Sequence, residues 1–148
     1  MPQSLASVLI HLIFSTKNRE PTIPHERLPQ LHAYIVGILD NLQCPSLRTG
    51  GVVDHTHTPF SLSRTATIAA VVEEVKTGSS KWMKQQGVLH FAWQAGYAAF
   101  SVSESQKAAV IRYIEQQAEH HKRHSFQEEV RTFLARHGVA YDERYVWD

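Results

Sequence analysis

The sequence predicts an α+β fold, a ferredoxin-like or RNA-recognition-like antiparallel sheet with packed helices and further helices at the C-terminus. The apolar pattern alternates between periods of two and about 3.6, which favours the order β, α, β, β, α, β, α, α. The chain has 148 residues, of which 43% are hydrophobic, enough for one domain with a sizeable core. No repeat or linker-like stretch divides it, so we expect a single domain over residues 1–148.

The first half of the chain contains a strand, a helix and a pair of strands. Residues 7–17 (SVLIHLIFSTK) are mostly apolar and β-branched and are followed by a polar segment, which is typical of a central strand. Pro24 suits the first turn of a helix that should end before Pro45. Its apolar stripe comprises Leu28, Leu31, Ile35, Ile38 and Leu39. Residues 45–63 alternate in polarity around a Gly-Gly pair, so we expect strands there.

A second helix is the clearest feature of the second half. Apolar side chains recur at helical spacing from Ile68 to Met83. Gly78 and the two serines after it are expected to loosen the middle of this helix. Residues 90–103 mix aromatic with small residues, which indicates a strand and a turn.

Two capping patterns open the last helices. Ser103 with Gln106 predicts a third helix to about residue 121, and Ser125 with Glu128 predicts a fourth that stops at Gly138. The buried stripe expected on the third helix comprises Lys107, Val110, Ile111, Ile114 and Ala118.

Composition narrows the function classes. The apolar run at residues 8–14 is far shorter than the ~18 residues of a membrane span, so we expect a soluble, cytoplasmic chain without a membrane partner. Cys44 is the only cysteine, which excludes an internal disulfide and a multi-cysteine zinc finger. A net charge of +1 does not mark a nucleic-acid binder, although it permits a local basic face. Ten histidines are the one unusual feature.

Two of these histidines, His55 and His57, lie in an expected strand. Residues i and i+2 of a strand face the same side, so both imidazoles would point together at a spacing suited to one metal ion, with Thr56 facing the core. A pair alone is more often two half-exposed polar residues, so further ligands decide the question. Asp54 could orient an imidazole or cap a strand or turn, and both alternatives stay open.

A second polar group lies on the third expected helix. On a helical wheel of ~100° per residue, Tyr113, Gln117, His120 and His124 form a strip within roughly 60° beside the buried stripe. Residues 120–124 (HHKRH) indicate a solvated helix end, with phosphate contacts as the alternative. For Tyr113 and Gln117, a place at the border of the core and a functional role are equally compatible with the pattern.

Five segments together resemble a known family. In this order and spacing, HLIFSTK, DHTH, WQAGYAAFSVS, YIEQQAEHH and FLARHGVAYDERYVW are similar to the single-tyrosine, HUH-type transposases of bacterial insertion sequences, including those associated with repetitive extragenic palindromes. The resemblance covers nearly the whole chain. Members have a histidine-hydrophobe-histidine motif, whereas this chain has Thr56 in the hydrophobic place, a β-branched residue that suits a strand.

The resemblance implies a role for each matching residue. His55, His57 and Gln117 would hold a divalent metal ion, Mg²⁺ or Mn²⁺, and Tyr113 would attack a phosphate of single-stranded DNA, leaving a 5′-phosphotyrosine and a free 3′-hydroxyl. A phenol with an ordinary pKa of ~10 needs such help from a metal ion on the phosphate. The resemblance further implies hairpin-containing element ends as DNA partner. It also implies a homodimer in which the histidines of one subunit meet the tyrosine helix of the other, with a monomer as the alternative, because some relatives work as monomers.

Basic residues could form a local face for DNA despite the small net charge. They are Lys17, Arg19, Arg48, Arg64, Lys76, Lys81 and Lys84. Each of them could equally be an ordinary surface charge. Two rival functions stay open: a non-catalytic module that binds single-stranded nucleic acid, and a metal-dependent hydrolase that uses His55, His57 and a third histidine such as His120 without a covalent intermediate.

Overall fold

The structure, a computed structural model, describes residues 2–121 and 123–148, with only the backbone of His120. One antiparallel sheet, in the order β2-β3-β1-β4, consists of β1 (Leu9–Ser15), β2 (Gly50–Val52), β3 (His55–Ser61) and β4 (Ala98–Val102). The α-helices are α1 (Leu28–Asn41), α2 (Ile68–Gln85), α3 (Lys107–Glu115), α4 (Gln117–His120) and α5 (Phe126–Arg136). The element order and strand order confirm the ferredoxin-like α+β arrangement. Among the described helices, none is long and apolar enough to cross a membrane.

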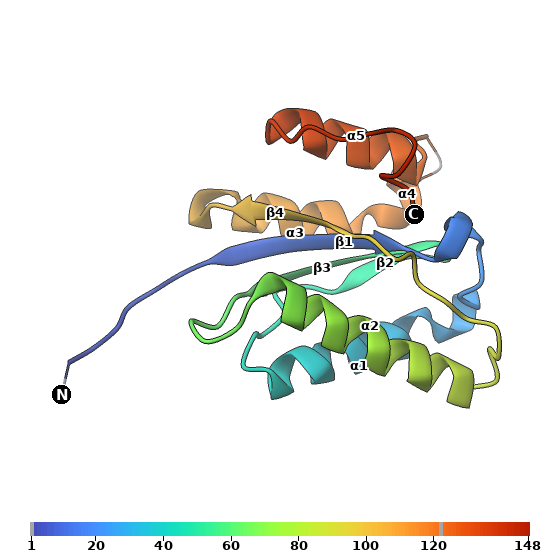
Figure 1. Ribbon diagram of the computed structural model, residues 1–148, viewed down its shortest axis with the longest axis horizontal. Coiled ribbons are helices and arrows are strands. Elements are labelled where there is room, and N and C mark those ends of the chain that lie inside the picture. The colour runs from blue at the N-terminus through green and yellow to red at the C-terminus, as the bar shows by residue number, and fades with distance from the viewer. Residues whose placement is uncertain (1, 122) are drawn as a thin grey trace.

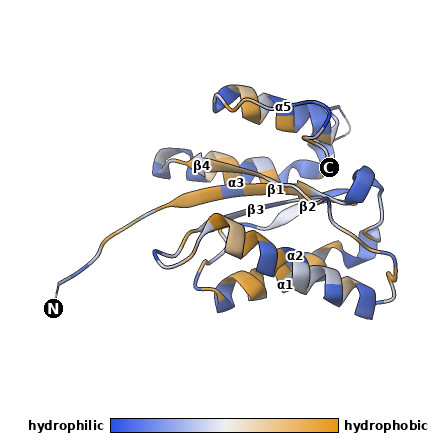
Figure 2. Ribbon diagram, viewed as in Figure 1, coloured by the Kyte–Doolittle hydropathy of each residue, from blue (hydrophilic) through white to orange (hydrophobic). Residues whose placement is uncertain are grey.

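Helices cover both faces of the sheet. Figure 1 shows α1 and α2 together on one side of β1 and α5 on the other. Alternate residues of β1 therefore enter two different cores: Leu12 and Phe14 pack towards α1 and α2, whereas Ile13 packs with Phe100 and α5. All seven residues of β1 are buried, because helices cover both faces of the sheet. This explains why the strand is apolar along nearly its whole length (Figure 2).

The middle of α2 is not loosened, so that expectation is wrong. The helix is continuous from Ile68 to Gln85, and its small residues serve packing. A Cβ atom at Gly78 would lie 2.8 Å from Ile38 Cδ1, so glycine allows α1 to approach. Ser79 Oγ donates to the Val75 carbonyl at 2.6 Å and accepts from the Trp93 indole at 2.9 Å, which ties α2 to the segment before β4.

The single long helix expected after residue 103 is also wrong. A 3₁₀ turn comes first, and Ser103 makes no capping hydrogen bond. The helix then stops at Gln116, whose φ of −98° and ψ of 14° turn the chain before α4. Because of this turn Ala118 leaves the expected stripe and is exposed, and Ile114 alone among the stripe residues is fully buried.

The last helix is confirmed. Ser125 accepts a hydrogen bond from the Glu128 amide at 3.2 Å, as a capping residue should. The helix ends at Arg136, two residues before Gly138, which has a φ of 64° in the left-handed region. The sequence therefore placed α5 correctly to within the usual uncertainty of helix ends.

Candidate metal and tyrosine site

Strand β3 presents the histidine pair to the face covered by α3 and α5. The side chains of His55 and His57 are fully buried, and their ring centroids lie 5.3 Å apart. Thr56 points to the opposite face, as expected, where its hydroxyl is buried without a hydrogen-bond partner among the described residues. The pair therefore shares one face in a site closed to bulk water.

The turn between α3 and α4 brings Gln117 to this pair. Gln117 is buried, its Oε1 lies 3.2 Å from His55 Nε2, and its Nε2 lies 3.4 Å from the Tyr113 carbonyl oxygen. The Tyr113 ring meets the His57 ring edge-on at 5.8 Å between centroids. The structure thus brings all four expected site residues together within one chain.

Glu129 on α5 also enters the site, which the sequence analysis missed. Its side chain is buried, and its Oε1 lies 2.8 Å from His57 Nε2 and 3.6 Å from His55 Nε2. Its Oε2 accepts a hydrogen bond from the Tyr113 hydroxyl and lies 3.2 Å from His121 Nε2. One carboxylate therefore bridges the histidines and the tyrosine.

A sequence pattern could have pointed to Glu129. It falls within the apolar stripe of α5, between buried Phe126 and Val130. A charged residue in a buried stripe is almost always paired. The stripe therefore indicated that Glu129 meets partners inside the fold, although not which partners.

His121 is the second missed residue. We expected a solvated helix end there, and for His121 this is wrong, because its side chain is only 12% exposed and its Nε2 lies 2.9 Å from Gln117 Oε1. The chain turns at Gln116, and this turn swings His121 inward. His124 is exposed, as expected, whereas the expectations for the side chain of His120 and for Lys122 lie outside the described residues.

Asp54 and His11 contact the Nδ1 atoms of the two histidine rings, on the side away from Glu129. Asp54 Oδ1 lies 2.6 Å from His55 Nδ1, which favours the orienting role over the turn role. His11 Nε2 lies 2.8 Å from His57 Nδ1. A carboxylate can only accept, so His57 donates its Nε2–H to Glu129, and its Nδ1 accepts a hydrogen bond from His11. If a metal ion bound His57 at Nε2, the proton would lie on Nδ1, and His57 would donate to His11 instead. His11, a histidine inside an otherwise apolar strand, was also missed.

The residues present fit a divalent metal ion. Donor atoms of His55, His57, His121 and Glu129 all lie within 4.8 Å of one another. Ligands on opposite sides of an ion with bonds of about 2.1 Å are about 4.2 Å apart, so small side-chain movements would suffice. Imidazoles suit Zn²⁺, Cu²⁺ or Ni²⁺, whereas carboxylate and amide oxygens suit Mg²⁺ or Mn²⁺, so the donor set fits a divalent cation without fixing its identity.

Burial and the Glu129 charge shift the pKa values of this site in opposite directions. Burial alone would raise the pKa of Glu129, but hydrogen bonds from His121 and His57 hold it well below its ordinary value. Burial lowers the pKa of His57, which keeps a neutral imidazole available as a ligand. Burial, and then Glu129, raise the pKa of Tyr113 above its ordinary value, so the phenol stays protonated.

Two of the basic residues expected to contact DNA lie near the site. Lys17 and Arg19 follow the end of β1 at which Ser15 pairs with His55. Arg19 lines a cavity of about 440 Å³ together with Asp54 and His121.

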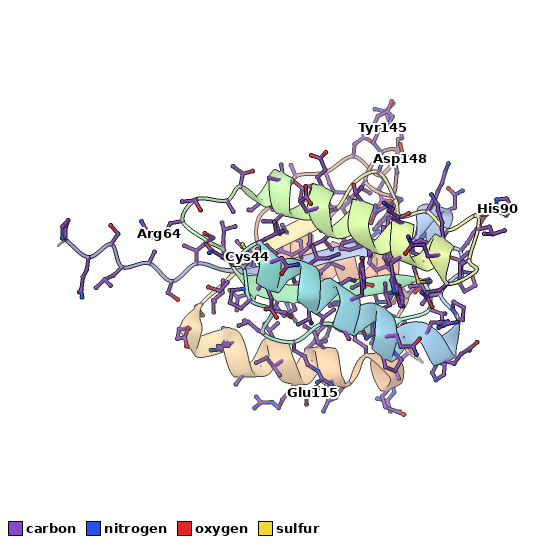
Figure 3. The ribbon with its side chains drawn as sticks, turned by 90° about the horizontal axis from the view of Figure 1, so that it is seen from below. Cys44, Arg64, His90, Glu115, Tyr145 and Asp148 are labelled. Atoms are coloured by element: carbon purple, nitrogen blue, oxygen red, sulfur yellow. The ribbon has the colours of Figure 1, made fainter. Side chains whose placement is uncertain are left out.

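The other basic residues lie elsewhere. Arg64 follows the far end of β3, and Figure 3 shows it at the opposite end of the molecule from His90. Lys81 and Lys84 are exposed on α2, across the sheet from the histidines. The Lys76 ammonium donates to the carbonyls of Gln94, Ala95 and Gly96, and Arg48 is exposed before β2.

Histidines, an amide and a carboxylate that could hold a metal ion lie beside a tyrosine hydroxyl on one face of a ferredoxin-like sheet. The profile of the family described as "Transposase IS200 like" matches residues 4–117, and the chain belongs to this family of transposases. The resemblance found in the sequence is thereby confirmed.

Two solved structures share the fold. A candidate transposase from Deinococcus radiodurans R1 is 23% identical, with a TM-score of 0.61 over 79% of this chain and 98% of that chain. A REP-associated tyrosine transposase bound to a REP hairpin is 13% identical, with a TM-score of 0.59 over 82% of this chain and 72% of that chain. Comparison with curated proteins gives no match.

Proposed function

We propose that this chain cleaves and rejoins single-stranded DNA through a covalent 5′-phosphotyrosine on Tyr113. The observation that carries the proposal is the shared carboxylate: Glu129 accepts the Tyr113 hydroxyl on one oxygen and meets His57 on the other. The Glu129 side chain therefore lies between the proposed nucleophile, Tyr113, and the buried group of donors that could bind a metal ion. Membership of a transposase family supports DNA as the substrate.

The metal-binding residues of the proposal are His55, His57 and Gln117, with Glu129 and His121 in reach of the same point. A bound divalent ion would orient the scissile phosphate and neutralise its charge. We favour Mn²⁺ or Mg²⁺, because the set includes carboxylate and amide oxygens. Asp54 and His11 keep the two imidazoles in the orientation that binding needs.

The reaction is one in-line exchange at phosphorus. The Tyr113 oxygen forms the new P–O bond, the bond from phosphorus to the DNA 3′-oxygen breaks, and the strand leaves as a 3′-hydroxyl. Glu129 Oε2 accepts the hydrogen bond of the phenol and so orients its oxygen, while the phenolic proton passes to solvent and the leaving 3′-oxygen takes a proton from solvent. The phosphodiester count is unchanged, so a second 3′-hydroxyl can reverse the step without ATP.

For the DNA partner we propose hairpin-containing element ends in the bacterial cytoplasm. The structural neighbour bound to a REP hairpin, together with the family, supports this choice. We also propose a homodimer, from the sequence resemblance. One chain brings its own Tyr113 close to its own His57, so each subunit of a dimer could carry a self-contained site, and sites shared between subunits are the alternative that the mixed-subunit experiment below tests.

The Tyr113→Phe variant tests the reaction. A labelled single-stranded hairpin with Mn²⁺, on a denaturing gel, should show a covalent adduct with wild type and with the control Tyr97→Phe, whose tyrosine is 43% exposed. Tyr113→Phe should give no adduct while it binds DNA within a few-fold of wild type. A free 5′-phosphate without adduct would support the hydrolase instead, and binding without any cleavage would support the non-catalytic module.

Mixed subunits test the arrangement of the dimer. Subunits with His55→Ala are exchanged with subunits that carry Tyr113→Phe. Self-contained sites keep one lesion each, so the mixture should stay inactive when mass measurement shows heterodimers. Recovery of a substantial part of the wild-type cleavage would show that the sites are shared.

A further inference from the structure

A cavity of about 820 Å³ lies between α3 and α5, beside β4. This volume is within the range of about 300–1,000 Å³ that ligand sites occupy. Tyr113 and Glu129 both line the cavity. Because the Tyr113 hydroxyl donates to the Glu129 carboxylate, the cavity reaches the nucleophile of the proposed reaction.

One side of the cavity is aromatic. Phe100 is nearly parallel to Phe133, with 5.6 Å between ring centroids, and to the exposed His137, at 4.6 Å. Phe133 also meets Tyr113 edge-on at 5.7 Å. All four rings line the cavity, so an aromatic surface extends from the nucleophile to the solvent-exposed rim.

The polar groups of the cavity suit a phosphate and a sugar. The hydroxyls of Ser101 and Thr132 line it, and so does Arg136, which is exposed and pairs with no carboxylate among the described residues. The two carboxylates of the cavity meet histidines instead: Glu129 contacts His57 at 2.8 Å, and Glu128 contacts His124 at 3.3 Å. The guanidinium therefore remains available for an anion.

We propose that this cavity binds one unpaired base of single-stranded DNA, that of the nucleotide next to the phosphate that Tyr113 attacks, and that Arg136 contacts a neighbouring phosphate. The inference rests on the proposed function, because attack on a phosphodiester brings the adjoining nucleotides to the tyrosine. An aromatic surface, hydroxyls and one cation are the complement of a base, a sugar and a phosphate. Stacking tolerates any base, so the cavity places the strand without fixing its sequence.

Two neighbouring alanines on α3 provide a matched test. Ala108 and Ala109 are both exposed, but only Ala109 lines the cavity. Ala109→Trp should fill the base site and weaken binding of a labelled oligothymidylate at least about fivefold, the lower end of the effect of one stacked base. Ala108→Trp should bind within twofold of wild type. Ala109→Leu adds a smaller side chain, so its affinity for the oligothymidylate should lie between those of the two tryptophan variants. It replaces Ala109→Trp as the test if that variant folds poorly.

Binding is measured by fluorescence anisotropy in EDTA, so that no metal ion or cleavage contributes. A second strand of the same length with abasic sugars separates base contacts from phosphate contacts. Wild type and Ala109→Trp should bind the abasic strand equally, whereas Arg136→Ala should weaken both strands relative to Arg112→Ala, an exposed arginine of α3 outside the cavity. Two results would overturn the inference. One is an equal loss of affinity in Ala108→Trp and Ala109→Trp. The other is a loss of affinity in Ala109→Trp that persists with the abasic strand.

The two proposals fail in different ways. If wild type forms no covalent adduct, but Ala109→Trp still loses affinity only for strands with bases, the base site stands and the tyrosine chemistry falls. If the adduct forms and Ala109→Trp binds and reacts like wild type, the chemistry stands and the base site falls.

Discussion

Replacement of Glu129 by glutamine removes the carboxylate that joins the tyrosine to the histidines. Glu129 is only 3% exposed and meets Tyr113, His57 and His121. The substitution keeps the shape of the side chain but removes its charge. The buried partners then lose a charged acceptor and keep at most one amide oxygen in its place.

The cost follows from these contacts. A hydrogen bond to a charged group contributes about 1.5–3 kcal/mol and a neutral one about 0.5–1.5 kcal/mol, while desolvation of the charge offsets part of the gain. We therefore expect Glu129→Gln to lower the free energy of unfolding by about 2–4 kcal/mol without metal. Glu128→Gln is the matched control: its carboxylate is 59% exposed and pairs with the exposed His124, so the substitution should cost less than ~1 kcal/mol.

The pH dependence of this difference tests the same contacts. The lowered pKa of Glu129 means that its contribution is present above the ordinary carboxyl pKa of ~4.3 and is lost as the pH falls further. Burial would lower the pKa of His121, but Glu129 raises it above its ordinary value, so the share of His121 is present below ~6.5 and is lost as the pH rises through the raised value. The difference between wild type and Glu129→Gln should therefore be greatest between about pH 5 and 6.5.

Urea unfolding in EDTA at several pH values measures this difference. A Glu129→Gln variant as stable as Glu128→Gln at pH 6 would refute the reasoning. So would a difference that grows as the pH falls below about 4, because a protonated carboxyl cannot hold the histidines by charge.

Three further outcomes are expected. His57→Ala should weaken Mn²⁺ binding at least about tenfold in calorimetry with DNA present, and Gln117→Ala should weaken it less; unchanged affinity would make the histidine pair structural. Burial, and then the charge of Arg48, lower the pKa of His32 to about 4. The unfolded chain therefore binds more protons than the folded chain between about pH 6.5 and 4, and the free energy of unfolding falls as the pH falls through that range. His32→Gln should flatten this fall in urea titrations. Gly50→Ala places a Cβ atom 2.6 Å from Ile114 Cγ2 and should cost about 1–3 kcal/mol, whereas an unchanged urea midpoint would show that α3 yields.

The sequence alone determined the order of the elements and the side on which the histidines lie. Strand β1, helix α1 and helix α5 follow from periodicity and from the Ser125 cap, which act over a few residues. That His55 and His57 share a face follows from the period of two in any strand. These features need no knowledge of the rest of the chain.

Only the tertiary structure decided how the site is completed. His57 and Glu129 are 72 residues apart, and they meet because α5 packs on the same face of the sheet as the pair. The turn at Gln116, which brings Gln117 and His121 inward, interrupts a helix that local propensity alone would continue. The apolar stripe of α5 indicated only that Glu129 has partners inside the fold. Which partners it has depends on how the helices pack over the sheet, and this packing selected the tyrosine and the histidines.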